Sequence, residues 1–463
     1  MRSRASVLDA AAIAIVHAGA CVLVRAAGFD HVSDDDFARV TIAQTFAHAP
    51  HLDPSGTSWL PFPFWALGAA MEIFGRSLAV ARGASIALAS AAATLPYLAL
   101  RRAGTPRVRA LVATAFALLS PWSLWLGAAT VPESMTASAA AAAVMALAAR
   151  REGQGEGHDH ARTAAGRRSY AEHVATSTRR ETAALVFWGI VLMCACLSRY
   201  EAWPAAAVAA VALAWRAWQV RARTKALAFA AALAVVGPLA WMAWNAHAHD
   251  GPLHFFRRVS TFKRAIGDGS TDTLDALVFF PRLLVTTRPD VVVAVAIALA
   301  ICWSRRDLWR RRSVPVAAAA AQLAFLAIGN ARDGAPAHHA ERALLPTIML
   351  LAPFAMDVIL DAARTMRGRP RVLLIGGNAI VVAAWLVAMR PLFAAPPGSS
   401  PADDRSAQLT RGRELQAEPH LVVEPCAFEH FALLAAYGAP ERAEILPHTN
   451  APVTPDCPRV EAR

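Results

Sequence analysis

The chain has 463 residues, of which 56% are hydrophobic and 17% charged, and its mean hydropathy is +0.36. Soluble domains carry about 25% charged residues, so this composition, with its recurring long apolar blocks, excludes an ordinary soluble protein. The net charge of +12 does not indicate nucleic-acid binding, because the basic residues stand between apolar blocks, where they report membrane topology.

Eleven apolar blocks predict about eleven transmembrane helices. The blocks cover residues 8–27, 78–100, 111–126, 134–149, 182–197, 203–215, 226–244, 291–303, 314–328, 343–360 and 372–389. Every second connection is rich in arginine, and the positive-inside bias places such connections in the cytoplasm. We therefore expect an all-α polytopic membrane protein with its N-terminus in the cytoplasm and its C-terminus outside.

The loop that follows the first block, residues 29–77, carries the consecutive acids Asp34, Asp35 and Asp36. One interpretation is a solvated helix start, where Asp is favoured. The other is a carboxylate at the mouth of a pocket in the membrane. Residues 37–48 are expected to form an amphipathic helix on the membrane, and the prolines and aromatics of 61–65 to start a second helix.

Other unusual polar residues fall on the same predicted face of the membrane. They are Glu133, Arg199, Tyr200, Glu201, His338, His339, Glu341 and Arg342. Ionisable groups at membrane depth are costly and by default indicate a functional site. Simpler interpretations remain open: a helix-start acid for Glu133, mutual pairing of Arg199 with Glu201, and an exposed loop for the histidines. Adjacent histidines rarely bind one metal ion, and no third ligand is evident.

Two long loops differ in character. The outer loop 245–290 contains RRVSTFKR, in which Arg257, Arg258, Lys263 and Arg264 have no acid beside them. This stretch is either a solvated basic helix or an anion site suited to a lipid phosphate. The cytoplasmic loop 150–181 is poor in apolar residues and is expected to be a disordered connector, so its His158 and His160 do not predict a metal site.

The tail, residues 391–463, is predicted to be a small extracytoplasmic α/β domain. After a linker rich in Pro, Gly and Ser, a strand is expected at 420–424, a helix at 428–437 capped by Gly438, and a second strand at 443–446. Cys426 and Cys457 are the two cysteines clear of apolar blocks. In an oxidising compartment they would form a disulfide worth on the order of 3 kcal/mol, and two free thiols are the alternative.

Three short motifs carry a resemblance to a known family. They resemble motifs of membrane glycosyltransferases of the GT-C superfold, and they are DDFARVTIAQ (35–44), PFPFW (61–65) and HAERALLP (339–346). The similar branches are the protein O-mannosyltransferases and the aminoarabinose transferases of bacterial lipid A. The register of Ile42-Ala43 assigns Asp35 to the family's catalytic aspartate and Asp36 to its acidic neighbour, which is usually Glu. Asp34 makes a one-residue slip of this register conceivable.

The resemblance implies an enzyme in the inner membrane of a bacterium, with residues 1–390 as its transferase domain. It would transfer a hexose-type sugar, with inversion, from a polyprenyl-phosphate donor to a protein, lipid or glycan acceptor on the outer face. Asp35 would be the general base, with Asp34 and Asp36 beside it. The candidate substrate-binding residues are Glu133, Arg199, Tyr200, Glu201, Arg257, Arg258, Lys263, Arg264, His339 and Arg342. Cationic residues can stabilise the leaving phosphate; Asp-rich loops also bind divalent cations, and the sequence leaves the need for one open.

Other functions agree less well with this sequence. A transporter or a flippase of lipid-linked sugars would favour internal repeats and polar residues at mid-membrane, whereas this sequence shows no repeat and its polar residues gather at one face. A lipid-linked-oligosaccharide ligase is a rival enzyme. A phosphoethanolamine transferase would require a large soluble metal-binding domain, and a receptor or scaffold would not explain the acidic cluster.

Overall fold

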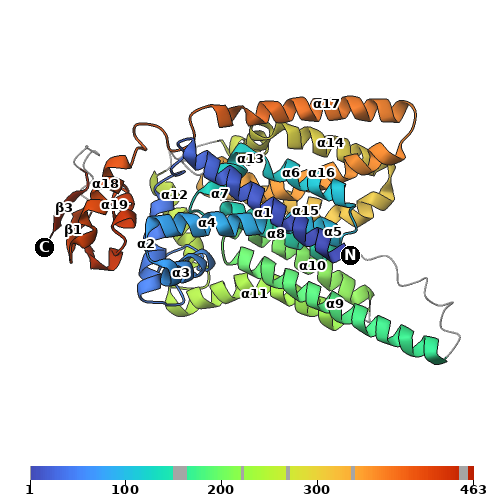
Figure 1. Ribbon diagram of the computed structural model, residues 1–463, viewed down its shortest axis with the longest axis horizontal. Helices are drawn as coiled ribbons and strands as arrows, with labels where there is room; N and C mark the ends of the chain where they lie inside the picture. The colour runs from blue at the N-terminus through green and yellow to red at the C-terminus, as the bar shows by residue number, and fades with distance from the viewer. Residues whose placement is uncertain are drawn as a thin grey trace.

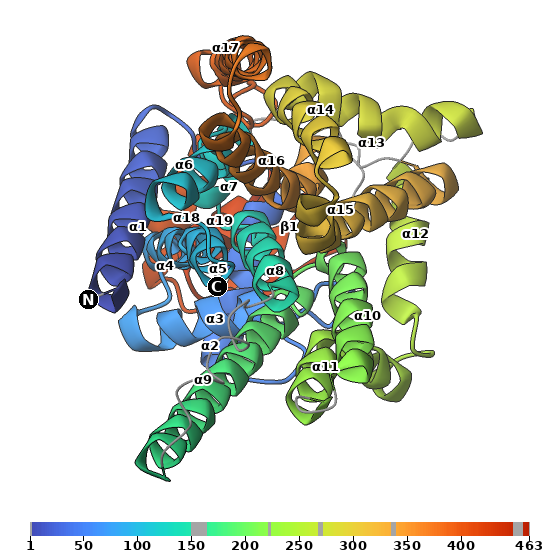
Figure 2. The same ribbon diagram turned by 90° about the vertical axis from the view of Figure 1, so that its right-hand side faces the viewer.

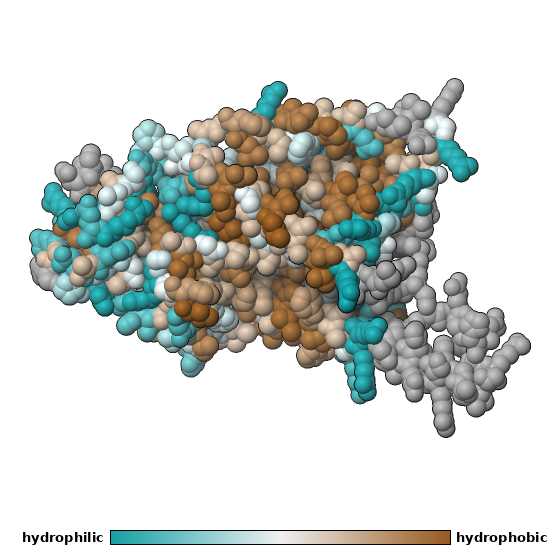
Figure 3. All heavy atoms as spheres, in the orientation of Figure 1, coloured by the Kyte–Doolittle hydropathy of each residue, from teal (hydrophilic) through white to brown (hydrophobic). Residues whose placement is uncertain are grey.

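The computed structural model describes residues 2–149, 164–220, 224–266, 272–334, 339–447 and 457–462. Most helices run along the longest axis of the molecule, and a small domain lies at one end beside α2 and α3 (Figure 1). Hydrophobic residues form a broad band around the middle of the bundle, and hydrophilic residues gather at its ends (Figure 3). This distribution is that of an integral membrane protein.

The described residues of the first half of the chain are helical almost throughout. The elements there are α1 (Arg2–Ala26), α2 (Asp35–His48), α3 (Phe62–Phe74), α4 (Leu78–Ala93), α5 (Leu95–Arg102), α6 (Arg107–Leu118), α7 (Pro121–Ala128), α8 (Glu133–Ala148), α9 (Ala164–Cys196), η2 (Tyr200–Ala202) and α10 (Trp203–Gln219). The second half continues the bundle. Its elements are α11 (Thr224–Ala248), α12 (His254–Ile266), α13 (Thr273–Thr287), α14 (Pro289–Ser304), α15 (Arg306–Asp333), η4 (Ala340–Leu344), α16 (Leu345–Thr365), α17 (Arg369–Met389) and η5 (Arg390–Phe393).

Eleven spans are not confirmed. Within the described residues, six helical segments are long and apolar enough to cross a membrane, and the number rises to eight if two bent pairs each count as one span. Those pairs are α6 with α7, bent by 76°, and α13 with α14, bent by 100°. Three predicted blocks remain, and all are helical. Helices α8 and α10 have 16 and 17 residues, below the roughly 20 that a straight crossing needs, while block 182–197 is the last part of the 33-residue α9.

Helix α8 occupies the centre of the bundle. It contacts α4, α5, α9, α10, α15 and α16, and it lies near the middle of the view down the bundle in Figure 2. Its sequence, ESMTASAAAAAVMALA, is buried almost throughout. Small side chains let neighbouring helices approach closely in a membrane, so this alanine run explains how one helix can contact these six and also α7.

Two predicted loops contain helix. Residues 164–181, expected to belong to a disordered connector, form the first part of α9, while His158 and His160 lie outside the described residues. The outer loop 245–290 contains α12 and α13. Pro281 and Arg282 interrupt the apolar sequence of α13, so its sequence does not form a continuous apolar block.

The tail domain contains the β-α-β unit that its sequence predicted. Its elements are α18 (Ser406–Glu414), η6 (Leu415–Ala417), β1 (Leu421–Glu424), α19 (His430–Tyr437), η7 (Pro440–Arg442), β2 (Ala443–Ile445) and β3 (Arg459–Ala462). Strand order is β2-β1-β3, with β2 parallel and β3 antiparallel to β1. Gly438 ends α19 with a φ of 87°, as a C-terminal cap should. The predicted disulfide between Cys426 and Cys457 is present; α18 and β3 were not predicted.

Helix α18 packs against α19 at a glycine. A Cβ added at Gly412 would lie 2.2 Å from the carbonyl oxygen of Leu433. Gly412→Ala should therefore force the two helices apart, and limited proteolysis should cleave the tail domain roughly tenfold faster than in the wild type. Gly329→Ala in α15 is the control, because no atom lies within 4 Å of its added Cβ. Equal cleavage rates in both variants would contradict this packing.

Candidate active site

The three consecutive aspartates at the start of α2 occupy three different environments. Asp36 is buried, and its carboxylate accepts hydrogen bonds from the backbone N–H groups of Val32 and Ser33, at 3.0 and 3.3 Å. The N–H and the hydroxyl of Thr130, in the connection from α7 to α8, also donate to it, at 2.8 and 3.1 Å. Four donors around one buried carboxylate tie the start of α2 to the bundle.

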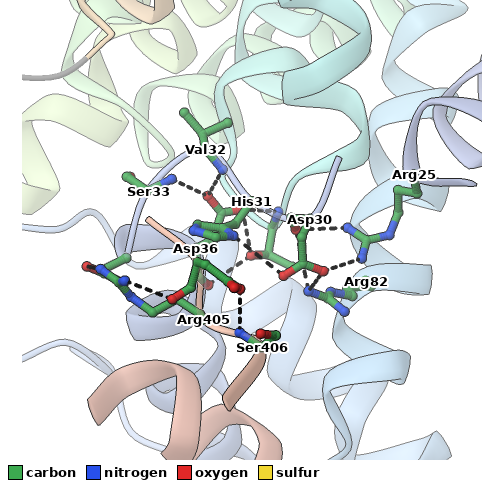
Figure 4. Close-up of polar contacts among 12 residues, drawn as sticks. Arg25, Asp30, His31, Val32, Ser33, Asp36, Arg82, Arg405 and Ser406 are labelled. Atoms are coloured by element: carbon green, nitrogen blue, oxygen red, sulfur yellow. Dashed lines mark hydrogen bonds and ion pairs between the residues drawn. The ribbon is translucent and has the colours of Figure 1, made fainter. Parts of the chain in front are cut away.

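Asp34 faces the tail domain instead. The Arg405 guanidinium donates to both of its carboxylate oxygens, at 2.8 and 2.9 Å. The loop just before it is held as well: Asp30 pairs with Arg25 of α1 at 3.2 Å and with Arg82 of α4 at 2.6 Å. Figure 4 shows the contacts of Asp30 with Arg25 and Arg82, and the Asp36 carboxylate below the backbone of Val32 and Ser33. Burial raises the pKa of Asp30, but His31 and the two arginines outweigh it and lower that pKa to about 2.

Asp35 is the member of the trio that stays open. Its side chain is 47% exposed, and its closest charged partner is the Arg342 guanidinium at 3.6 Å. No residue in the described part of the chain donates a hydrogen bond to its carboxylate at the distances seen for Asp34 and Asp36. This carboxylate therefore keeps its lone pairs available for a bound molecule.

Glu133, the first residue of α8, joins the loops that surround Asp35. One of its carboxylate oxygens, Oε1, accepts from Arg199 at 2.7 Å and from Arg342 at 2.9 and 2.6 Å. Arg199 in turn donates to both oxygens of Glu201, at 3.0 and 2.5 Å. Burial raises the pKa of Glu201, but the charge of Arg199 outweighs it and the net shift is downward. The sequence analysis named all four residues, and the structure brings them together.

Arg39 adds a further cation to this cluster, and it forms no direct ion pair with a described residue. It lies one helical turn after Asp35 on α2 and is 4% exposed. Its Nε and one terminal nitrogen have no hydrogen-bond partner among the described residues, and its guanidinium lies over the ring of Trp59 at 4.5 Å. Burial lowers its pKa to about 10, with Glu133, Arg199, Asp35 and Arg342 as the neighbouring charges. Arg39 thus stays protonated at neutral pH and carries unused donors.

Tyr200 and His339 support the same cluster. The Tyr200 hydroxyl donates to the backbone oxygen of Ser58 at 2.6 Å, and its ring stacks on Phe255 at 4.7 Å. His339 precedes the 3₁₀ turn η4 with a φ of 53°, and its carbonyl accepts the N–H of Arg342. A left-handed conformation is costly for a residue other than glycine, so His339 helps to set the turn that aims Arg342 at Glu133. His338 lies outside the described residues.

The basic stretch of α12 lies mostly at the surface. Arg257 and Arg258 are exposed, and Arg257 donates to the backbone oxygen of Asp250. Arg264 pairs with Asp333 at the end of α15, at 3.1 Å, so the acid missing from the local sequence comes from a distant segment. Lys263 is half-buried, and burial lowers its pKa, while Asp333 and Glu201 act against that shift. Lys263 thus interacts electrostatically with Glu201 of the cluster.

Sequence reasoning missed two residues of this site as candidates. Arg39 stood within a quoted motif but was not singled out, although its spacing from Asp35 places both on one face of a helix. Arg405 lies 371 residues from Asp34, and no local pattern could have linked them.

Comparison with known proteins gives the fold a precedent. Two crystal structures of ArnT from Cupriavidus metallidurans are similar, one bound to undecaprenyl phosphate and one in the apo state. The first has a TM-score of 0.56 and 13% sequence identity, covering 94% of this chain and 89% of its own. The second has a TM-score of 0.55 and 15% identity, covering 97% and 90%. No family model and no curated protein matches the sequence. The expected resemblance to aminoarabinose transferases of the GT-C fold is confirmed at the level of the fold.

Glu133 is predicted to hold the site together. Glu133→Gln would leave the guanidiniums of Arg199 and Arg342 without their shared charge, and breaking such a buried pair costs on the order of 3 kcal/mol. The apparent melting temperature of the purified protein should fall by several degrees. The control is Glu414→Gln, which breaks an exposed pair with Arg411 and should change little. Equal melting temperatures for the two variants would remove the structural role of Glu133.

Proposed function

We propose that this protein transfers a sugar from a polyprenyl-phosphate donor to an acceptor, with Asp35 as the general base. The observation that carries the proposal is the contrast within the aspartate trio. Asp34 is committed to Arg405 and Asp36 to Thr130 and two backbone groups, whereas Asp35 is open and stands beside a cationic cluster. This contrast favours the register that the family resemblance assigned, with Asp35 as the catalytic residue.

The proposed transfer is a single displacement at the anomeric carbon, with Asp35 as the base. The Asp35 carboxylate takes the proton of an acceptor group while that group attacks the anomeric carbon of the sugar. The bond between the anomeric carbon and the phosphate oxygen breaks, and the polyprenyl phosphate leaves with the bonding electrons. Attack from the face opposite the leaving group inverts the anomeric configuration. A hexose-type sugar is the proposed cargo, and a protein, lipid or glycan the proposed acceptor.

Arg39 is the best-placed residue to meet the phosphate that leaves. Its Nε and one terminal nitrogen are buried without a hydrogen-bond partner among the described residues, while Arg199 and Arg342 share Glu133. A preorganised cation in a water-poor site stabilises developing negative charge strongly, so we propose that transfer proceeds without a divalent cation. The second oxygen of Glu133, Oε2, is buried without a hydrogen-bond partner among the described residues, which suits a sugar hydroxyl.

Two further observations support a lipid-linked donor on the outer face. One of the similar ArnT structures has undecaprenyl phosphate bound, and we propose by analogy that this chain binds a polyprenyl phosphate. The tail domain with its disulfide adjoins the site, and disulfides persist in oxidising compartments. We therefore place the site and the C-terminus outside the inner membrane of a bacterium, and the N-terminus in the cytoplasm.

The three aspartates should respond differently to loss of charge. Asp35→Asn should lower the turnover of a polyprenyl-phosphate sugar by about 10²-fold or more with an unchanged melting temperature, because it removes the base and no structural bond. Asp36→Asn should instead lower the melting temperature, because it weakens a buried four-donor carboxylate. Purified variants assayed with a panel of donors give both values. Full activity in Asp35→Asn would refute the assignment, and inactivity of Asp34→Asn alone would shift the register by one residue.

The donor phosphate should depend on Arg39. Arg39→Gln is expected to raise the apparent KM for the donor by about tenfold or more, since a charge-assisted hydrogen bond is worth about 1.5–3 kcal/mol. The acceptor KM should move little. Arg257→Gln with Arg258→Gln tests the competing location on α12, where the predicted effect on donor KM is smaller. A larger effect from the α12 pair, or none from Arg39→Gln, would place the phosphate elsewhere.

A further inference from the structure

The tail domain docks on the helix that begins with the aspartate trio. Helix α19 packs along α2, and the two lie together at the end of the bundle in Figure 1. Phe37, Val40 and Ala43 of α2 belong to one hydrophobic cluster with residues of α18 and α19. The side-chain amide of Gln44, which is fully buried, donates to the backbone oxygens of Ala435 and Arg76, at 2.9 and 2.8 Å. The interface is therefore a packed one.

Arg405 brings the tail domain to the first turn of α2. Its two bonds to Asp34 fix the orientation of that carboxylate, since a bidentate pair constrains geometry as well as distance. The backbone oxygen of Asp34 accepts the N–H groups of Phe37 and Ala38, at 3.1 and 3.0 Å. Asp34 is thus the residue on which the first helical turn closes.

Asp35 lies between two clamps of different origin. On one side Arg405 holds Asp34, and on the other Thr130 holds Asp36. Asp35 itself has no comparable bond to any residue that the structure describes, so its orientation depends on the backbone that its two neighbours fix. A general base must point at the proton it takes, and small misplacements reduce rate steeply.

We infer that Arg405 is a positioning residue: through Asp34 the tail domain sets the orientation of Asp35, so that the site is complete only when the tail is docked. This inference rests on the proposed role of Asp35 as the base. It gives the tail domain a part in turnover beyond covering the end of the bundle.

The kinetic test uses Arg405→Gln in the full-length protein. Turnover with a polyprenyl-phosphate sugar should fall about tenfold or more while the donor KM stays within about twofold, because Asp35 is misaligned and the cation cluster is untouched. Two matched variants serve as controls: Arg411→Gln removes an exposed arginine of the same helix, and Glu441→Gln removes the tail's ion pair with Arg76 at 2.8 Å, away from Asp34. Both should retain turnover. A fall in Glu441→Gln equal to that in Arg405→Gln would show that docking alone matters and would overturn the inference.

A double variant tests whether Arg405 acts through Asp34. Arg405→Gln combined with Asp34→Asn should have about the same turnover as the less active of the two single variants, because both changes remove the same link. Losses that multiply in the double variant would show that Arg405 acts by another route. Arg405→Lys, which keeps the charge, should retain more turnover than Arg405→Gln.

Hydrogen exchange separates this inference from the proposed function. In Arg405→Gln the backbone amides of residues 35–40 should exchange about tenfold faster than in the wild type, while the same amides in Arg411→Gln stay unchanged. This readout does not require an active enzyme. Faster exchange in a protein that transfers no sugar would uphold the clamp and refute the function; unchanged exchange would refute the clamp whatever the activity.

Discussion

The site depends on a buried carboxylate at the start of a buried helix. Glu133 opens α8, where the helix dipole favours negative charge, and it draws in Arg199 from the break between α9 and α10 and Arg342 from the turn before α16. Three connections far apart in the sequence meet at one oxygen of this carboxylate, Oε1. Without it, two guanidiniums would share a dry region with Arg39 and no adequate counter-charge.

The enclosed position of Glu133 follows from the sequence of its helix. A run of alanines lets α8 sit at the centre of the bundle with neighbours on every side, so its first residue reaches the polar end of the molecule already surrounded by protein. The same end receives α2, whose first turn is held by Thr130 on the bundle side and Arg405 on the tail side. The open carboxylate of Asp35 is what these fixed groups leave exposed.

Much of this arrangement could be predicted from residues near one another in the sequence. The apolar blocks indicated helices, and all of them are helical; the strand, helix and strand of the tail were placed within a few residues. The polar residues Glu133, Arg199, Glu201 and Arg342 were identified as one group because charges at membrane depth are costly. The count of eleven spans, taken from the number of apolar blocks, is not confirmed, because within the described residues six helical segments, or eight with the two bent pairs, are long and apolar enough to cross a membrane. The ion-pair partners of Asp34 and Arg264 could not be predicted from the sequence, because Arg405 and Asp333 lie in distant segments and no sequence pattern links them to these residues.

The most direct test of the account is a structure of this protein with a polyprenyl phosphate bound. The account predicts the phosphate within hydrogen-bond distance of the Arg39 guanidinium, on the side of the cluster that faces Asp35. A phosphate seated on the exposed arginines of α12, or at the opposite end of the bundle, would contradict it.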